Sequence, residues 1–494
     1  MIEARISQDK LGQAVRIGAA ASILGVTAQT IRNWVAQGRL NAVRHPINGY
    51  RLFSLSEINK LVAASSVAPQ VAVKGAGEEY VNPISYHWQA GKGIRTVLFP
   101  DGRPVVSQVE SRRRVKDYGA QHYELDWLRS KRLPEPASLG RRVRVGDAFS
   151  GGGIFSLGVD EGLRAAGLVP VHAFGLDFDG DAIATFRHNF PTSVALHEDV
   201  IAIANGTVGA AETREEKAFL RSIGGGLDVL VAGPPCQGHS DLNNHTRRED
   251  PKNNLYFSTV RLSELLQPTF VIVENVPGVV HDRQGVVSRT SEALTRLGYE
   301  VSTSLVDLRR LGVPQARKRF VLVASRRGAF DIEQALAAQA SEVRPVEWAL
   351  ADLQASYNEA VTYESSASHS AENRRRIDFL FENGLFELPN AERPPCHRDK
   401  THSYVSVYGR MRWDKPAPTI TGGFGSTGQG RFVHPLERRT LTPHEACRLQ
   451  FVPDFFDFPT VTGRRAMQQI IGNAAPPKLS QAIVLGAALQ GVLL

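Results

Sequence analysis

The stretch Leu227–Ser240, LDVLVAGPPCQGHS, changes character abruptly at its middle. The apolar run LDVLVA is typical of a short buried strand, and it ends at a glycine followed by two prolines. Proline fixes φ and restricts the residue before it, so Pro234 and Pro235 force the chain out of the strand. Cys236 therefore stands at the strand tip, whereas a thiol kept for packing would lie inside the run. A thiol at such a tip is a candidate nucleophile.

Four more β-rich runs share this pattern from Arg141 onward. RVRVGDAFS, VHAFGLDFD, TFVIVENV and RFVLVAS each end in glycine, acidic or polar punctuation, and helical stretches alternate with them. This rhythm is typical of a mostly parallel sheet with helices on both faces. Ligands of such sheets gather outside the carboxyl ends of the strands. We therefore expect an α/β, Rossmann-like catalytic core over residues 141–325.

Length and composition limit the class of protein. A chain of 494 residues has room for two or more domains, and its net charge of +8 mildly favours a polyanionic partner. Three cysteines are too few for a disulfide framework and favour a reducing compartment. We find no signal peptide and no apolar run near the ~20 residues of a membrane span. We expect a cytoplasmic, nucleoid-associated protein of prokaryotic type, without a membrane partner.

The first 65 residues predict a small DNA-binding unit. IGAAASILGV and AQTIRNWVAQ are short helical patterns, and LNAVRHPINGYRLF gives two strand-like runs around the turn signal Asn48-Gly49. This order, with the phrase TIRNWVAQGRL, resembles the MerR-type winged helix-turn-helix family. A small helical docking domain is the alternative. The exposed side chains of the second helix suit base edges and phosphates; they are Gln29, Thr30, Arg32 and Asn33.

Residues 66–140 are expected to form a linker and an accessory segment. RTVLFPDGRPVVSQVE predicts a hairpin around Asp101-Gly102. The basic run SRRRVKDYG is either a solvated face or a further DNA contact.

The run DAFSGGGIFSLG, Asp147–Gly158, predicts a ligand loop between a strand and a helix. Its glycines allow close approach of the backbone, and the helix offers free N–H groups. Asp177 at the next strand tip suits ribose hydroxyls, Phe178 can stack on a purine, and Asp199 follows at a third tip. Each acid could instead cap a helix or be solvated. Because no phosphate-loop or orderly dinucleotide signature is present, an adenosine ligand such as S-adenosylmethionine fits better than ATP.

Later strand tips carry further reactive groups. VIVENVPG ends with Glu274 and Asn275, and VPQARKRF supplies Arg317 and Arg319. Together GPPCQGHS, ENV, QARKRF, RRTLTPHEACRLQFVPD and IIGNAAPP resemble, in order and spacing, the motif series of the DNA cytosine-5 methyltransferases. The resemblance covers about seven-tenths of the chain, from Arg141 to its end.

The resemblance implies a mechanism. Cys236 would add to carbon 6 of a flipped cytosine in duplex DNA, which activates carbon 5 for the methyl group of S-adenosylmethionine. Glu274 would assist at ring nitrogen N3, and Arg317 and Arg319 would steady the base.

The resemblance also implies a set of cofactor contacts and some departures. Ile154 stands where the family usually has glycine, and His239 where Phe is commoner, which leaves open a modified S-adenosylmethionine as cofactor. The implied cofactor residues are Phe149, Gly151, Gly153, Asp177, Phe178, Asp199, Pro234, Leu255 and Asn473.

The alternation of strand and helix patterns ends after RFVLVAS. By resemblance, residues 326–437 form the target-recognition region, and residues 438–494 carry the final motifs back to the core. The cluster HRDKTH could suggest a metal site, but the adjacent Cys396 and His397 suit one ion poorly, so we expect no metal. The expected DNA contacts outside the N-terminal unit are Gln237, Ser240, Arg398 and Lys400.

Three readings of function therefore stand beside one another. The first is a DNA cytosine-5 methyltransferase of a restriction–modification or epigenetic system, acting as a monomer on double-stranded DNA, with a cognate restriction endonuclease as candidate partner. The second is a transcriptional regulator or autoregulator that works through the helix-turn-helix. The third, RNA methylation by the same core, is disfavoured by the DNA-type N-terminal unit.

Overall fold

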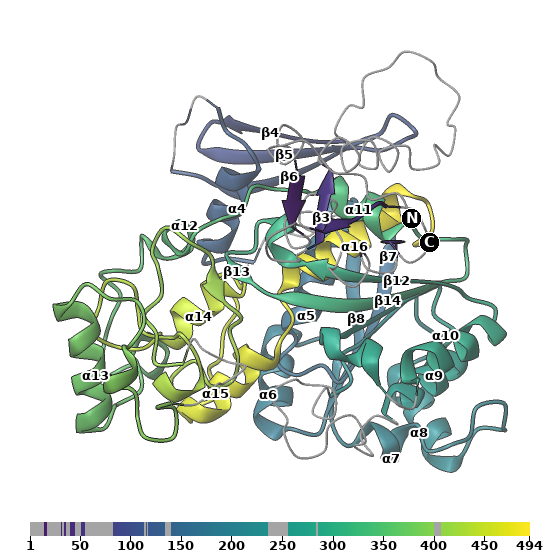
Figure 1. Cartoon of the computed structure of the whole chain (residues 1–494). Helices are drawn as coiled ribbons and strands as arrows, with labels where there is room; N and C mark the ends of the chain where they lie inside the picture. Colours follow the sequence, from purple (N-terminus) through teal and green to yellow (C-terminus); the bar gives the residue numbers. More distant parts are fainter. Residues whose placement is uncertain are drawn as a thin grey trace, which may run out of the picture. The chain divides into compact units, whose positions relative to one another are not determined.

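The computed structural model forms two compact units, Met1–Val81 and Asn82–Leu494. Figure 1 traces the chain, and each unit is considered by itself. Within the described residues no helix combines the length and apolarity needed to cross a membrane. The described residues are 14–16, 31, 34–35, 40–44, 51–54, 83–112, 115, 117–133, 140–235, 255–282, 285–399 and 407–494.

The N-terminal unit contains a three-stranded antiparallel sheet. Strands β1 (Ala14–Arg16), β3 (Arg51–Ser54) and β2 (Val43–Arg44) lie in that order. Val43 pairs with Leu52 in this sheet, so the strand pairing predicted around Asn48-Gly49 is confirmed, while the turn itself lies outside the described residues. The helix-turn-helix remains a prediction. Ile31, Trp34 and Val35, the predicted apolar face of its second helix, are helical.

The second unit is built on a seven-stranded sheet of order β12-β14-β11-β10-β7-β8-β9. Strands β7 to β11 are mutually parallel, whereas β14 runs antiparallel to both of its neighbours. The expected mostly parallel α/β core is therefore present. The strands are β7 (Arg142–Ala148), β8 (Val169–Asp177), β9 (Val194–His197), β10 (Val229–Ala232), β11 (Phe270–Asn275), β12 (Glu300–Asp307) and β14 (Lys318–Ser325).

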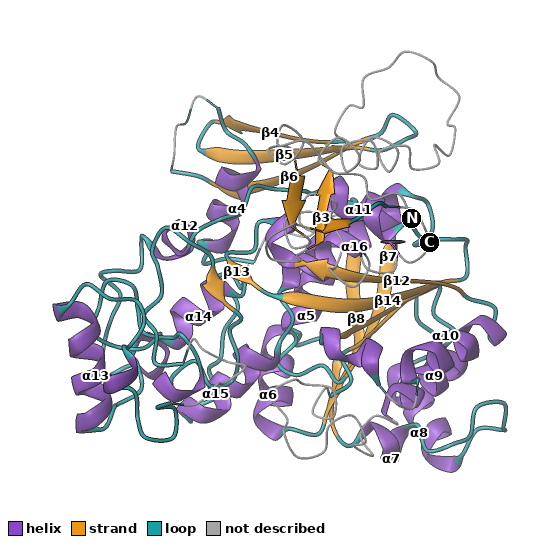
Figure 2. Ribbon diagram, in the orientation of Figure 1, coloured by secondary structure: helices purple, strands orange, loops and turns teal. Residues whose placement is uncertain are grey.

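Strand β10 shows why the central strands are continuous apolar runs. Val229 and Val231 face one hydrophobic core, and Leu230 and Ala232 face the other. All four side chains are buried because helices cover both faces of the sheet. The first core contains α5 (Ile154–Ala165) and α16 (Pro477–Leu489); the second contains α8 (Arg214–Ile223), α9 (Leu255–Leu266) and α10 (Val286–Arg296), which group together in Figure 2.

The first helix of this core, α5, packs directly on the last one, α16. A Cβ atom at Gly158 would lie 1.9 Å from the carbonyl oxygen of Pro477, so only glycine permits this approach. One turn on, a Cβ at Gly162 would meet the carbonyl oxygen of Gln481 at 2.9 Å. The end of the chain therefore completes a layer that its first strand–helix unit begins.

The accessory segment is an integral part of the second unit. Strands β4 (Ile84–Gln89), β5 (Lys92–Leu98) and β6 (Pro104–Glu110) form an antiparallel meander, followed by α4 (Ala120–Leu128). Leu98 pairs with Pro104, so the predicted hairpin around Asp101-Gly102 is confirmed. A buried ion pair joins Arg95 to Glu161 of α5 at 2.8 Å. Val97 packs with Ala165 and Leu485.

The region after residue 325, for which the sequence shows no periodic pattern, contains short helices and one strand of a small parallel pair. Strand β13 (Gln315–Ala316) pairs with β15 (Ala417–Pro418). Helix α14 starts where Thr442 and Glu445 form a reciprocal capping box. The helices are α11 (Ile332–Ala337), α12 (Val346–Leu350), α13 (Ala371–Glu382), α14 (Pro443–Leu449) and α15 (Arg464–Asn473).

Candidate active site at the strand ends

The parallel order of β7, β8, β10 and β11 brings their carboxyl ends to one edge of the sheet. Contacts across this edge are close. A Cβ at Gly233, just after β10, would lie 3.9 Å from the carbonyl oxygen of Phe149 and 4.0 Å from Oε2 of Glu274. This edge therefore brings together two predicted groups of residues. We call the strand tips at Phe149 and Asp177 the cofactor end, and the tips that carry Cys236, Glu274 and Arg319 the transfer end.

The loop Phe149–Gly153 after β7 has an unusual backbone. Phe149, Gly151 and Gly153 have φ values of 64°, 52° and 88°. A non-glycine residue in this left-handed region costs of order 1–3 kcal/mol, so Phe149 needs support from its surroundings. No atom lies within 4 Å of an ideal Cβ at Gly151, which leaves that side of the loop open to a ligand.

Asp177 at the end of β8 supports this loop. One carboxylate oxygen accepts the backbone N–H of Gly151 at 2.7 Å, and the other accepts that of Asp179 at 2.9 Å. Burial raises the pKa of Asp177, and the backbone N–H donors oppose this rise because they favour the charged form.

Three more of the expected cofactor residues are exposed to solvent: Phe178, Asp199 and Asn473. Phe178 is 67 % exposed. Its backbone carbonyl oxygen lies within hydrogen-bond distance, 3.0 Å, of Nε2 of His197. Asp199 is exposed and caps α7 (Val200–Ile203) by accepting the N–H of Ile201 at 3.0 Å, the alternative role that the sequence left open. Asn473 is exposed at the end of α15.

Ile154, which stands where the family usually has glycine, is 1 % exposed and belongs to the hydrophobic core. A modified S-adenosylmethionine as cofactor stays a prediction. His239 lies outside the described residues.

The chemistry of this end suits an adenosine ligand. An open glycine loop, an exposed aromatic ring and a backbone-held carboxylate follow one another over the tips of β7 and β8. Leu255, half-buried, begins α9 close after the segment that follows β10. These residues fit S-adenosylmethionine.

At the transfer end, Glu274 closes β11 beside a guanidinium group. Nε of Arg319 lies 2.5 Å from Oε1 of Glu274, and both side chains are nearly buried. Burial raises the pKa of Glu274, although the guanidinium groups of Arg319 and Arg317 oppose the rise. A carboxyl group in this state is suited to donating or sharing a proton.

Asn275 ties this carboxyl to the strand that leads to the cysteine. Its Nδ2 donates to the Pro234 carbonyl oxygen at 3.0 Å, and both atoms are buried. Sequence reasoning gave Asn275 no role, although a buried amide at a strand end was a usable signal. Cys236 itself lies outside the described residues, as do Gln237 and Ser240.

Arg317 binds the backbone of two distant segments. Nη1 donates to the Ile420 carbonyl oxygen at 2.5 Å, and Nη2 donates to that of Ala474 at 2.8 Å. Its guanidinium thus fastens the loop after β15 and the residues next to Asn473 to the site. The side chain is 1 % exposed, so its contact with a base stays a prediction.

Gln315 adds a second buried link that sequence reasoning missed. Its Nε2 donates to Oε1 of Gln450 at 2.6 Å, and its Oε1 accepts the N–H of Ile420 at 3.1 Å. Gln450 in turn donates to the Ile471 carbonyl oxygen at 2.7 Å. The final motifs are therefore held against the strand edge by amide hydrogen bonds.

The expected DNA contact Arg398 is exposed, and its Nη2 donates to the carbonyl oxygens of Ala391 and Arg393 at 2.9 and 3.1 Å. Lys400 lies outside the described residues. In the described part of the chain, no group of three or more His, Cys, Asp or Glu side chains is placed to hold a metal ion.

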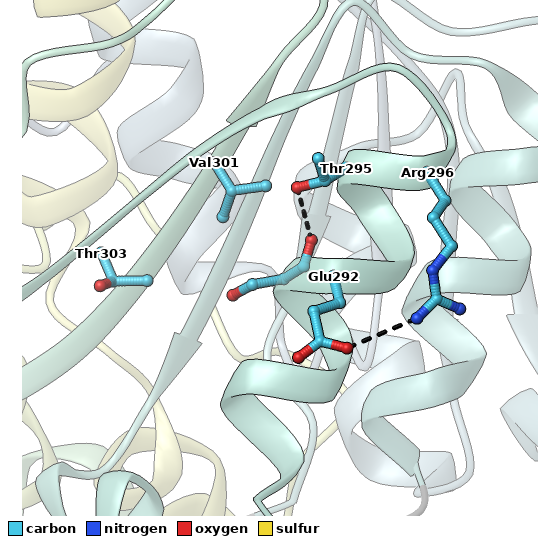
Figure 3. Close-up of a pocket in the computed structure, with 6 residues that line it drawn as sticks. Glu292, Thr295, Arg296, Val301 and Thr303 are labelled. Atoms are coloured by element: carbon cyan, nitrogen blue, oxygen red, sulfur yellow. Dashed lines mark hydrogen bonds and ion pairs between the residues drawn. The ribbon is translucent and has the colours of Figure 1, made fainter.

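A pocket of about 600 Å³ lies elsewhere, between α10 and the beginning of β12 (Figure 3). Glu292 and Arg296 form an ion pair along one wall, and Val301 and Thr303 form the other. Since β12 runs parallel to β11, the start of β12 lies at the opposite end of the sheet from the site. This pocket has no part in the strand-end chemistry.

Comparisons with known proteins agree with this geometry. The family described as C-5 cytosine-specific DNA methylase matches residues 143–486, and the MerR family of regulatory proteins matches residues 16–53. Type II methyltransferase M1.BsuMI of Bacillus subtilis is 47% identical over 363 residues, covering 74% of this chain and 84% of its own. M1.HphI of Haemophilus parahaemolyticus is 30% identical over 68% of this chain and 84% of its own.

Among solved structures, the S. pombe Dnmt2 methyltransferase aligns with a TM-score of 0.47 at 15% identity, over 71% of this chain and 99% of its own. That likeness adds no weight to the family match. The match over residues 143–486 and the 47% identical relative suffice. The chain belongs to the C-5 cytosine-specific DNA methylases.

Proposed function

We propose that this methyltransferase transfers a methyl group from S-adenosylmethionine to carbon 5 of a flipped cytosine in duplex DNA. The observation that carries the proposal is the Glu274–Arg319 pair, 2.5 Å apart, at the same sheet edge as the glycine loop. Asn275 links this pair to the strand that leads to Cys236.

S-adenosylmethionine supplies a methyl group on a positively charged sulfur. Asp177 would bind the ribose hydroxyls, because its carboxylate is already oriented by two backbone N–H groups. Phe178 would stack on the adenine, since its ring is exposed beside that carboxylate. The further residues that would line this site are Phe149, Gly151, Gly153, Asp199, Pro234, Leu255 and Asn473.

At the transfer end, the Cys236 thiolate would form a bond to carbon 6 of the cytosine, and electron density would move toward N3. Glu274 would donate or share a proton there, as its raised pKa favours. Arg319 would hold Glu274 and the base carbonyl. After carbon 5 has taken the methyl group, a base removes its proton and elimination frees Cys236. The cytosine must leave the stack for the thiol to reach it.

DNA recognition would be shared among several parts of the chain. We assign residues 1–65 to DNA binding, 66–140 to a linker and accessory segment, 141–325 to the catalytic core, 326–437 to target recognition and 438–494 to the final motifs. The named relatives are type II methyltransferases. We infer a restriction–modification setting, a cytoplasmic enzyme acting as a monomer on DNA, and a cognate endonuclease as partner. The DNA-contacting residues would be Gln29, Thr30, Arg32, Asn33, Gln237, Ser240, Arg398 and Lys400.

The test is to incubate the protein with genomic DNA and labelled S-adenosylmethionine and to map modified cytosines at base resolution. We expect 5-methylcytosine at one short sequence, and a covalent complex with a duplex that carries 5-fluorocytosine at this sequence. Label on another atom or on adenine would refute the proposal.

A second role is favoured by the match of residues 16–53 to the MerR regulatory family. The N-terminal unit would direct the protein to one particular DNA site, such as its own promoter. Deleting residues 1–65 should weaken binding to that site and leave methyl transfer measurable. Unchanged affinity for every duplex tested would exclude this role.

A further inference from the structure

The cofactor loop Phe149–Gly153 is held by more than its glycines. The Ser150 N–H donates to the Leu176 carbonyl oxygen at 2.9 Å, and Asp177 holds the Gly151 N–H. These bonds attach the middle of the loop to β8. Within the loop, the Gly153 N–H donates to the Ser150 carbonyl oxygen at 2.9 Å and closes the turn. None of these three bonds joins β7 directly to α5.

A buried side-chain hydrogen bond joins those two ends. Ser156, in the first turn of α5, donates from Oγ to Oδ2 of Asp147, the residue before the last of β7, at 2.6 Å. Asp147 is 2 % exposed and Ser156 is fully buried. The bond therefore joins the end of β7 to the first turn of α5, on either side of the loop.

Packing alone does not explain a carboxyl group at this position. Val143 and Val145 precede Asp147 on the same face of β7 and belong to the hydrophobic core, as does Leu157 of α5. The pKa of Asp147 is raised to about 7, because burial and, to a smaller degree, the Asp177 charge outweigh the lowering by the Ser156 bond and by the His172 ring. An apolar pair of similar volume would suit this core at least as well.

Two groups of β8 act electrostatically on Asp147. The Asp177 carboxylate binds the loop, and the His172 ring pairs with Asp160 of α5 at 2.5 Å. Resting on the proposed function, we propose that Asp147 is a positioning residue: through Ser156 it holds the loop in the backbone shape that binds S-adenosylmethionine.

The experiment measures kcat and KM for S-adenosylmethionine in the full chain with duplex DNA at saturation. Ser156→Ala and Asp147→Leu should each raise KM about tenfold, the effect of one lost hydrogen bond, and change kcat less than twofold. Asp147→Asn should restore KM to within twofold, because its amide oxygen still accepts the Ser156 hydroxyl. Ser263→Ala is the matched control: this serine is also fully buried, and its Oγ donates within α9 to the Thr259 carbonyl oxygen at 2.8 Å.

Thermal melting separates positioning from simple loss of stability. The double variant D147L/S156A should melt no lower than wild type yet keep the raised KM, and its effect should equal that of either single change because both remove the same bond. If folded S156A and D147L/S156A bind S-adenosylmethionine as wild type does, the positioning role is wrong. A wild-type protein without methyl transfer would instead refute the proposed function.

Discussion

The cofactor end and the transfer end hold their key carboxyl groups by different means. Asp177 receives two backbone N–H groups from its own strand tip and the neighbouring loop. Glu274 faces the guanidinium of Arg319, which belongs to another strand. Burial raises the pKa of both. The backbone donors favour the charged form of Asp177, which therefore serves as a hydrogen-bond acceptor. Glu274 can instead exchange a proton while the Arg319 guanidinium beside it stays charged.

The two ends also differ in the span of chain that builds them. At the cofactor end, the residues from Phe149 to Phe178 belong to consecutive strand–helix units between β7 and α6 (Gly180–Asn189), while Leu255 and Asn473 come from later segments. The transfer end needs Gln315 and Arg317 to bring in the backbone at Ile420 and Ala474. The glycine loop and its carboxylate are therefore assembled locally, whereas the bond-making half depends on contacts between distant segments.

The strongest test of this contrast is Cys236→Ser. A serine hydroxyl is a far poorer nucleophile than a thiolate, so methyl transfer should fall by at least about 10⁴-fold. Transfer of labelled methyl groups to DNA measures this, and a mobility shift should show unchanged duplex binding. Normal transfer by this variant would show that the cofactor end suffices without the thiol.

Glu274→Gln should have the next largest effect. The amide cannot donate the acid proton to the base, so kcat should fall about 10²- to 10³-fold while KM for S-adenosylmethionine stays within twofold. Single-turnover rates at saturating cofactor measure the step. A raised KM with normal kcat would assign Glu274 to cofactor binding and remove the distinction between the ends.

A pH titration of stability tests the packing of α14, whose C-cap residue Gln450 hydrogen-bonds to Gln315 near the transfer end. Burial lowers the pKa of His444, but the hydrogen bonds that its ring donates to Asp454 and Glu364, both at 2.9 Å, outweigh this and raise the pKa to about 9. The stabilisation is complete below the unfolded pKa of about 6.5 and is lost as pH rises through about 9, a change of about 3 kcal/mol.

Urea unfolding between pH 6 and 10 measures that change. His444→Gln should be less stable than wild type at pH 6 and should lack the alkaline loss. Parallel pH curves for the two proteins would show that folding does not raise the pKa of His444.

Asp177→Asn should have the smallest effect. The amide keeps one acceptor oxygen, so either the loop N–H or a ribose hydroxyl loses its partner, and KM for S-adenosylmethionine should rise about tenfold with kcat unchanged. Isothermal titration with the cofactor product checks the binding loss. A fall in kcat alone would contradict the proposed division of labour.

Local patterns in the sequence predicted the strand ends and a hairpin well. Alternating strand and helix runs placed Asp177 and Glu274 at strand tips, and Asp101-Gly102 marked a real hairpin. These features depend on neighbours in the chain, which periodicity and turn chemistry describe. The bond between Asp147 and Ser156 could have been suspected, because both are polar residues on apolar faces.

Other features depend on tertiary contacts that no pattern encodes. Nothing in QARKRF distinguishes Arg319, beside a carboxylate, from Arg317, on backbone carbonyls. The packing of Val97 against Leu485 was equally hidden, because it joins segments far apart in the chain. Ile154 was linked to a modified cofactor only because the family usually has glycine at that position. Its burial follows from its place at the start of α5.

The seating of α16 on α5 through Gly158 has a consequence for biosynthesis. During translation α5 emerges long before α16, so its apolar stripe has no cover until that distant segment has been made. Folding of the half that binds the methyl donor must await α16. A product terminated before α16 would expose this stripe to proteases and chaperones, which would remove fragments that lack it.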